Sequence, residues 1–246
     1  MGILNQFRER PIQCVYPTVS VGRIRSLQQH AQVRALQDGP GLELANEYFR
    51  EGLAGSQPTM VVRASVQHRI ERLRRYALRD GYGVRIFDAF RTKRTQAAIF
   101  EKFERDICLA HPDWSSEIIR IEALRYVAPP DNSRYPVLPH NSGGALDLVL
   151  TRDGQPIDMG TPFDSPAVLS ETTYFEGVQG PYSEMSVERW RRVKENRRML
   201  FHIMCYLGFT AHEREWWHFD LGNCRWANIY RSAWYYPSME EEVMAL

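Results

Sequence analysis

Helical and strand-like patterns alternate along this chain, and the alternation limits the possible folds more than the composition does. Residues 64–80, ASVQHRIERLRRYALRD, place Val66, Ile70, Leu73 and Ala77 three or four residues apart. That spacing is typical of the buried face of an amphipathic helix. The GYG that follows predicts the end of this helix.

The alternation continues into the C-terminal part of the chain. Strand-like patterns occur at residues 84–90, 145–151 and 209–221, and helical patterns at residues 92–111 and 186–208. The sequence RDGQ after the second strand-like segment predicts a hairpin turn. Helices interleaved with short strands and hairpin turns indicate a single α+β domain.

The length and the N-terminal segment suggest the domain organisation. The 246 residues suffice for a well-buried core. Residues 1–40 are polar and irregular, so we interpret them as an extension that packs on a body formed by residues 41–246. The N-terminus lacks the apolar run of a secretory signal, and no stretch approaches the length of a membrane span.

Charge and cysteine content narrow the expected partners and compartment. The chain carries 31 basic and 30 acidic residues without a long run of one sign, so nothing favours nucleic acid as a partner. We interpret the arginine-rich segment 189–198 as a solvated helix face. The four cysteines are scattered, which argues against a zinc-thiolate site and for a reducing compartment. A cytoplasmic location is therefore expected.

Most of the seven histidines are expected to have no chemical role. His30, His68 and His111 lie in polar surroundings and are predicted at the surface. His202 has apolar neighbours in a helical segment and is predicted to be packed in the interior. His140 and His218 differ from these histidines because acidic residues lie close to them in the sequence.

His140 opens the motif HNSGGALD, and Asp147 follows inside the apolar strand-like segment ALDLVLT. An acidic side chain in such a segment is costly to bury unless it is paired or bound to a metal. Gly143 and Gly144 allow a tight turn, so His140 and Asp147 could converge on one cation. The spacing alone leaves another interpretation open, a turn histidine and an aspartate bonded to backbone.

Glu215 and His218 bracket two tryptophans in EWWH. Two histidines and an aspartate form a workable ligand set for catalytic zinc with the fourth position left for water. Zinc lowers the pKa of such water to about 7, and a glutamate can take its proton. Glu215 suits that task if a bulge or strand end turns it toward His218, because positions i and i+3 of a regular strand face opposite ways. His212 and Glu213 are competing candidates.

The neighbouring tryptophans and an upstream arginine could complete such a site. Trp216 and Trp217 could form apolar walls that exclude water and raise the pKa of a nearby carboxylate, or they could simply be core. Arg91 directly follows a strand-like segment, where it could neutralise an oxyanion formed when water attacks a carbonyl. Asp88 could hold Arg91 in place, and a surface salt bridge is the alternative interpretation.

Three motifs together, HNSGGALDLVL, EWWHFDL and FDAFRTKR, resemble those of the D-alanyl-D-alanine dipeptidases of the VanX type. The pattern of that family is S-x-H-x-x-G-x-A-x-D followed by E-W-W-H, with W-D-x-Y-R-P upstream. The resemblance covers roughly residues 60–225. It implies a compact α+β domain with a central antiparallel sheet flanked by helices, shared with zinc D,D-carboxypeptidases and the hedgehog signalling domain.

The resemblance also implies a role for individual residues. It implies one zinc ion per chain, bound by His140, Asp147 and His218. It implies Glu215 as the general base and acid, and Arg91 as the group that stabilises the oxyanion.

Substrate recognition follows the family less closely. The resemblance points to Asp164, in MGTPFD, as the partner of the substrate ammonium, and we place Trp216 and Trp217 beside the substrate. Leu138 stands where the family has serine, and Tyr48 is the nearest aromatic to a family tyrosine.

The implied activity is zinc-dependent hydrolysis of D-Ala-D-Ala or a closely related small dipeptide, in cell-wall recycling or glycopeptide resistance. The first alternative is a zinc D,D- or L,D-carboxypeptidase that acts on longer muropeptides, which usually requires export. The second alternative is a non-catalytic zinc-binding domain, against which the presence of Glu215 and Arg91 argues.

Overall fold

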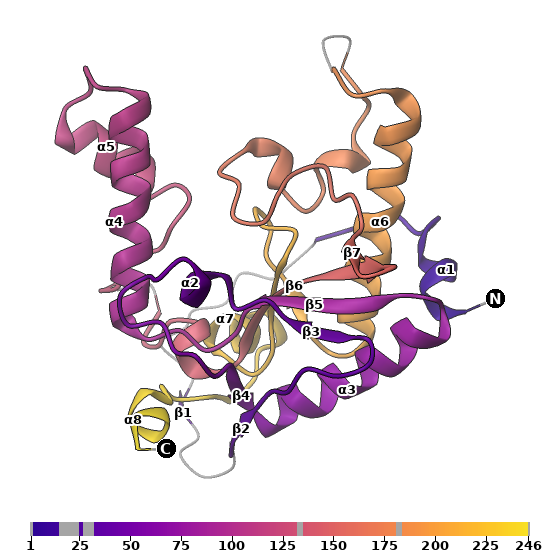
Figure 1. Cartoon of the computed structure of the whole chain (residues 1–246), viewed down its shortest axis with the longest axis horizontal. Helices are drawn as coiled ribbons and strands as arrows, with labels where there is room; N and C mark the ends of the chain where they lie inside the picture. The colour runs from indigo at the N-terminus through magenta and orange to yellow at the C-terminus, as the bar shows by residue number, and fades with distance from the viewer. Residues whose placement is uncertain (1, 15–24, 27–31, 132–134, 181–183, 246) are drawn as a thin grey trace.

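A computed structural model describes residues 2–14, 25–26, 32–131, 135–180 and 184–245 of the chain. Within them, a sheet lies at the centre and helices surround it (Figure 1). His30, which the sequence placed at the surface, lies outside the described residues. No helix in the described ranges combines the length and the apolar composition needed to cross a membrane.

The central sheet has six strands among the described residues. Its main path runs in the order β3 (Leu42–Leu44), β5 (Gly83–Asp88), β6 (Ala145–Arg152), β9 (His218–Asp220) and β8 (Thr210–Ala211), and β7 (Gln155–Pro156) pairs with β6. Neighbouring strands are antiparallel except β3 and β5, which are parallel. The predicted α+β fold with a central antiparallel sheet is confirmed, with one parallel strand added at the edge.

The helices form two groups around the sheet (Figure 1). Helix α3 (Ala64–Arg79) packs against β5, and α6 (Val187–Tyr206) packs against β8. Helices α4 (Lys93–Ala110) and α5 (Ser116–Ala123) pack against each other and extend to one side of the sheet. The other described α-helices and strands are α1 (Ile3–Phe7), β1 (Arg25–Ser26), β2 (Val33–Ala35), α2 (Glu47–Arg50), β4 (Val61–Arg63), α7 (Cys224–Tyr230), β10 (Trp234–Tyr235) and α8 (Glu240–Met244). Short 3-10 helices lie at His140–Ser142, Val168–Ser170 and Tyr174–Glu176.

The helix predicted from apolar spacing at residues 64–80 is confirmed as α3. Its four predicted core positions are buried in the main hydrophobic core. The helix ends where the GYG begins, and Gly81 has a φ of 79°, a left-handed conformation that glycine adopts without steric cost. The spacing of the side chains and the position of the glycine therefore suffice to place this element.

The strand-like segment 209–221 is only partly a strand. Residues 210–211 and 218–220 pair as β8 and β9, but residues 212–217 form the loop between them. The middle of this loop bonds to another segment, since Thr172 N donates to Glu213 O at 2.9 Å and Trp216 N donates to Ser170 O at 3.1 Å. The ends of the loop bond to strands, since His212 N donates to His218 O and Leu148 N donates to Trp217 O, both at 3.0 Å. The aromatic residues of this segment predicted a strand because they are buried. Their burial, however, does not require that the backbone pair with a neighbouring strand.

The arginine-rich part of α6 is also not uniformly solvated. Arg197 is only 2% exposed, because it lies on the face of α6 that Val193 and Leu200 bury. Its guanidinium donates to the carbonyl oxygens of Met159, Leu169 and Glu171 at 2.7, 2.8 and 2.9 Å. Arg197 thereby fastens residues 159–171 to α6, and this segment in turn supports the β8–β9 loop.

The described N-terminal residues pack on the rest of the chain. Helix α1 lies against α6 and α3, and Leu4 is fully buried in the main core. The backbone N–H of Leu4 donates to Asp80 Oδ2 at 2.7 Å, and Arg8 pairs with Glu195 at 3.2 Å. These contacts join residues 3–8 to the rest of the chain, and the division at residue 40 stays a prediction. Residues 1, 15–24 and 27–31 of the predicted extension are outside the described ranges.

Candidate metal centre and active site

The register of the sheet brings together the three residues predicted to bind metal. Strands β6 and β9 are antiparallel, with Asp147 directly opposite His218. His140 lies in the short 3-10 helix His140–Ser142, just before β6. His140 Nε2 lies 3.1 Å from His218 Nδ1 and 3.4 Å from Asp147 Oδ2, and His218 Nδ1 lies 3.0 Å from Asp147 Oδ1. Three buried donors therefore face one point.

The turn between His140 and Asp147 depends on Gly143. Its φ of 70° is left-handed, and an added Cβ would lie 2.2 Å from the sulfur of Met239. A larger residue would therefore be strained and would collide with Met239. Glycine at this position lets the chain pass from the 3-10 helix into β6 while both ligands face the same way.

Hydrogen bonds to the far side of each imidazole fix how the rings point. His140 Nδ1 lies 2.6 Å from Ala89 O, and His218 Nε2 lies 2.9 Å from Asp220 Oδ1. The other nitrogen of each ring is thereby turned toward Asp147. Partners of this kind orient metal-binding histidines and fix their tautomer. Asp220 is completely buried, and its role could have been inferred from HFD, since i and i+2 in a strand share a face.

The charges around the centre favour a cation. Burial lowers the pKa of His218, but Asp220 and Asp147 outweigh that effect, so the pKa of His218 is raised. Burial raises the pKa of Asp147, but His140 and His218 outweigh it, so the pKa of Asp147 is lowered. A bound metal ion would take the place of the protons that these groups share.

The donor set fits zinc. Imidazole nitrogen and carboxylate oxygen are zinc ligands, and in a tetrahedral site with bonds of about 2.0–2.1 Å the ligand atoms lie about 3.3 Å apart. The two imidazole nitrogens lie 3.1 Å apart, which is close to that value. The Asp147 carboxylate lies beside both of them, with Oδ1 3.0 Å from His218 Nδ1 and Oδ2 3.4 Å from His140 Nε2, and one ligand atom from each residue lies within 4.8 Å of the others. Three protein ligands leave a fourth position for water or substrate, which is typical of catalytic zinc sites.

Removal of the charge behind His218 tests this arrangement. Asp220→Asn is expected to weaken zinc binding by about 10–100-fold, because the ring loses the carboxylate that orients it and raises its basicity. Competition with a zinc chelator measures the affinity. Asp153→Asn, on the exposed β6–β7 turn, is the charge-matched control. Equal zinc affinity in Asp220→Asn and the wild type would show that Asp220 does not position His218.

The bend of the β8–β9 loop places Glu215 beside the metal ligands. Its carboxylate Oε2 lies 3.9 Å from His218 Nδ1, and its side chain is 28% exposed. His218 N donates to Glu215 O at 3.2 Å, so a turn, and not a straight strand, joins the two residues. Burial raises the pKa of Glu215, and His218 opposes this. Glu215 therefore lies beside the cluster and binds a proton more readily than an exposed glutamate.

Arg91 reaches the same cleft from the end of β5. Its guanidinium donates to Asp88 Oδ2 from Nε at 3.0 Å and from Nη2 at 2.8 Å, and to Gln96 Oε1 at 2.8 Å. Nη2 lies 3.6 Å from Asp147 Oδ2. Burial lowers the pKa of Arg91, but Asp88 and other anionic neighbours outweigh it, so the pKa is raised. Arg91 is thus a fixed and permanently charged donor.

The cleft around these groups has a volume of about 710 Å³. Several residues that the sequence comparison with the family had singled out line its walls. Tyr48 is buried in it, and the guanidinium of Arg91 lies 4.7 Å from the centre of its ring. Leu138 and Trp217 also line the cleft. Tyr48 therefore occupies the position of an active-site aromatic, although its sequence context gave only a loose match.

Of the residues expected to contact the substrate, Asp164 lines the cleft and Trp216 does not. Trp216 is buried, donates from Nε1 to Thr161 Oγ1 at 2.9 Å and does not line the cleft, so the structure does not bring it to the substrate side. Asp164 does line the cleft. Burial and the nearby Glu215 and Asp147 carboxylates raise its pKa to about 7, although Arg91 lowers it.

The remaining candidates lie outside the three-ligand cluster. His212 lines the cleft 5.5 Å from His218 between ring centres, and Glu213 is exposed at its rim. His68 and His111 are exposed, as predicted. His202 is packed, as predicted, and its Nε2 lies 2.9 Å from Arg10 O.

A family profile and two sequence relatives match most of this chain. The profile of peptidase family M15, described as D-Ala-D-Ala dipeptidase, matches residues 45–234. A D-alanyl-D-alanine dipeptidase of Synechocystis sp. is 28% identical over 79% of this chain and 80% of its own length. One of Enterococcus faecium is 28% identical over 63% of this chain and 69% of its own length.

Solved structures are less similar. A vancomycin-resistance D,D-pentapeptidase, VanY, in complex with Zn(II), is 17% identical with a TM-score of 0.40, over 78% of this chain and 88% of that one. Similarity at this level is too low to compare the two sites. The family profile spans every predicted catalytic and metal-binding residue, and the ligands it covers meet at one point. The chain therefore belongs to the D-Ala-D-Ala dipeptidase family M15 and is a zinc metallopeptidase.

Proposed function

We propose that this protein hydrolyses D-Ala-D-Ala or a closely related small dipeptide. The observation that carries the proposal is the placement of Glu215 and Arg91 in one cleft with the His140–Asp147–His218 centre. Hydrolysis adds the hydroxyl of water to the scissile carbonyl carbon and a proton to the leaving amine. The cleft holds a proton acceptor and a fixed cation, which are the two groups this reaction requires from the protein.

Glu215 acts as the general base and then as the general acid. Zinc, when bound by the three ligands, supplies a Lewis acid that lowers the pKa of water to about 7 and polarises a carbonyl. Glu215 takes a proton from the attacking water and later gives it to the nitrogen of the leaving amine. The raised pKa of Glu215 favours the first step, because it makes the carboxylate a better proton acceptor than an exposed glutamate.

Arg91 and Asp164 act on the charged parts of the substrate. The guanidinium of Arg91 is held by Asp88 and Gln96, so it stabilises negative charge on the carbonyl oxygen without first having to be ordered. Asp164 accepts hydrogen bonds from the free ammonium of the dipeptide, which is a charge-assisted interaction. The positive charge of Arg91 acts on the carbonyl oxygen and the negative charge of Asp164 acts on the ammonium, so the two groups together orient the dipeptide.

Turnover of a defined panel of peptides by the zinc-loaded protein tests the proposal. The panel contains D-Ala-D-Ala, L-Ala-D-Ala, L-Ala-L-Ala and a longer muropeptide ending in D-Ala-D-Ala. We expect D-Ala-D-Ala to be cleaved best. Cleavage of the muropeptide alone would contradict the dipeptidase assignment and favour a carboxypeptidase, and cleavage of none would contradict the hydrolytic function.

Asp164→Asn is expected to lower kcat/KM for free dipeptides by about 10–100-fold, because a charge-assisted bond to the ammonium is lost. Asn tolerates the left-handed φ of 61° at this position, so the backbone is preserved. Asp158→Asn, in the same segment and paired with Arg189, is the control. An equal loss on N-acetylated dipeptides would contradict the ammonium-binding role.

The pH dependence provides a second readout for Asp164. Its carboxyl, with a pKa raised to about 7, is neutral below that pH and charged above it. The attraction for a protonated ammonium therefore decreases as the pH falls through 7. The ammonium of the dipeptide itself loses its proton at about pH 8, so we expect KM for free dipeptides to rise as the pH falls from about 7.5 to about 6. We expect this rise to disappear in Asp164→Asn.

A further inference from the structure

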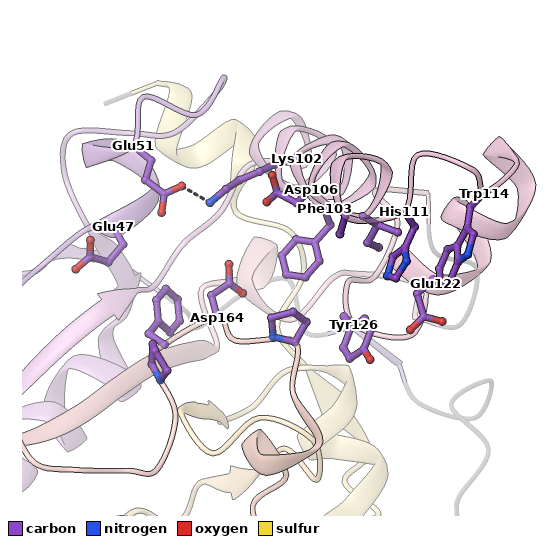
Figure 2. A pocket seen from close by; sticks show the side chains of 15 residues that line it. Glu47, Glu51, Lys102, Phe103, Asp106, His111, Trp114, Glu122, Tyr126 and Asp164 are labelled. Carbon is purple, nitrogen blue, oxygen red and sulfur yellow. Dashed lines mark hydrogen bonds and ion pairs between the residues drawn. The ribbon is translucent and has the colours of Figure 1, made fainter. Parts of the chain in front are cut away.

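A second cavity adjoins the cleft at Asp164. It has a volume of about 580 Å³, within the size range of small-ligand sites. It lies between α2, α4 and the segment that carries Asp164, and the two hollows share Phe103, Tyr126, Asp164 and Pro166 as lining residues. Figure 2 shows Asp164 between the carboxylates of Glu47 and Glu51 on one side and the aromatic side chains on the other. None of the proposed catalytic residues lines this second cavity.

The charge of the second cavity is negative. Five carboxylates line it, with Lys102 as the basic residue. Lys102 pairs with Glu51 at 2.6 Å, and Glu122 pairs with Arg125 at 2.9 Å. The other three carboxylates, on Glu47, Asp106 and Asp164, form no side-chain ion pair with any residue that the structure describes. With Asp164 assigned to the α-ammonium, a further cation in the cavity would meet the carboxylates of Glu47 and Asp106, which form no ion pair among the described residues.

Aromatic rings form the opposite wall (Figure 2). His111 and Trp114 stack with ring centres 3.9 Å apart, and Trp114 is 37% exposed. Phe103 is buried at the junction of the two hollows. The faces of aromatic rings attract ammonium groups and also cover the methylene groups that carry them. Carboxylates opposite aromatic rings are suited to a cationic group on a short apolar stem.

We propose that this cavity binds an ammonium group that the substrate carries beyond its first α-carbon. The inference rests on the proposed dipeptidase function, because Asp164 would hold the α-ammonium at the junction of the two hollows. The atoms attached to that first residue then face the second cavity. The ammonium belongs to a basic side chain of the first residue, because an additional amino-terminal residue would turn the α-ammonium that Asp164 holds into an uncharged amide.

Binding to the zinc-loaded Glu215→Gln protein tests the inference without turnover. D-Lys-D-Ala and D-norleucine-D-Ala have side chains of similar length, but only the first ends in an ammonium. At low ionic strength we expect D-Lys-D-Ala to bind at least about fivefold more tightly than D-norleucine-D-Ala. Added salt should weaken this preference, because it screens partly exposed charges. Calorimetry gives both dissociation constants.

A tripeptide pair tests the other possible source of an ammonium. Gly-D-Ala-D-Ala carries its ammonium on an added residue, and its N-acetylated form does not. Tighter binding of the free tripeptide would contradict the inference, because the nitrogen that Asp164 is proposed to hold is then an amide, and equal affinities within the dipeptide pair would also overturn it. Preference for D-Lys-D-Ala alone supports it.

Matched variants on α4 and α2 locate the effect. The double variant Glu47→Gln with Asp106→Asn should bring the ratio of the two dipeptide affinities toward one. Glu101→Gln removes an exposed charge from α4 outside the cavity and should keep the ratio. An unchanged ratio in the double variant would overturn the inference. Failure of the wild type to cleave D-Ala-D-Ala would instead contradict the proposed function, since the binding ratio does not depend on turnover.

Discussion

Glu215→Gln is expected to reduce kcat for D-Ala-D-Ala by about 10²–10⁴-fold while zinc stays bound, because an amide cannot take the proton of the attacking water. Glu215 is not one of the three clustered ligands, so the zinc content of the variant should equal that of the wild type. The two side chains have nearly the same shape, so the fold should be preserved.

The control for this prediction is Glu213→Gln, in the same loop and exposed at the rim of the cleft. It removes the same charge two residues away and should keep most of the activity. Metal analysis and steady-state kinetics on both variants give the comparison. Normal turnover by Glu215→Gln, or an equal loss in the control, would remove Glu215 from the proton-transfer step.

Arg91→Lys is expected to lower kcat by about 100-fold, the usual cost of removing a donor to a developing oxyanion. Lysine keeps the positive charge but cannot reproduce the forked contacts to Asp88 and Gln96. The effect should fall mainly on kcat, because charge on the carbonyl oxygen develops in the transition state.

Arg94→Lys, on the exposed side of α4, controls for the general effect of the exchange. Thermal unfolding should be measured with both variants, since Arg91 also neutralises buried Asp88. Loss of kcat with an intact unfolding transition and full zinc content supports the catalytic role. A kcat equal to that of the wild type would show that Arg91 only stabilises the fold.

Side-chain spacing allowed the sequence to predict the elements that depend on local patterns. The helix at Val66, Ile70, Leu73 and Ala77 could be placed because periodic burial of one face is recorded directly in the sequence. The strand at residues 145–151 could be placed from its apolar run and the following turn, where Gly154 has a φ of 76°. These features depend on residues close together in the chain.

Features that depend on distant partners were not predictable in this way. Arg197 resembled its solvated neighbours in the sequence, but the carbonyl groups that it binds belong to a segment about 30 residues away along the chain. Asp220 is different, because its bond to His218 joins residues two positions apart in one strand, and the HFD pattern alone indicates that they share a face. The turn that brings Glu215 to His218 depends on bonds to Ser170 and Thr172, which no local pattern records.

Titration of zinc into metal-free protein, with D-Ala-D-Ala hydrolysis as the readout, tests the central claim most directly. The cluster of His140, Asp147 and His218 predicts that activity rises from near zero and stops rising at one zinc ion per chain. The same titration of His218→Ala should give no activity at that ratio. Hydrolysis that is independent of zinc, or that survives in His218→Ala, would contradict the account of this site.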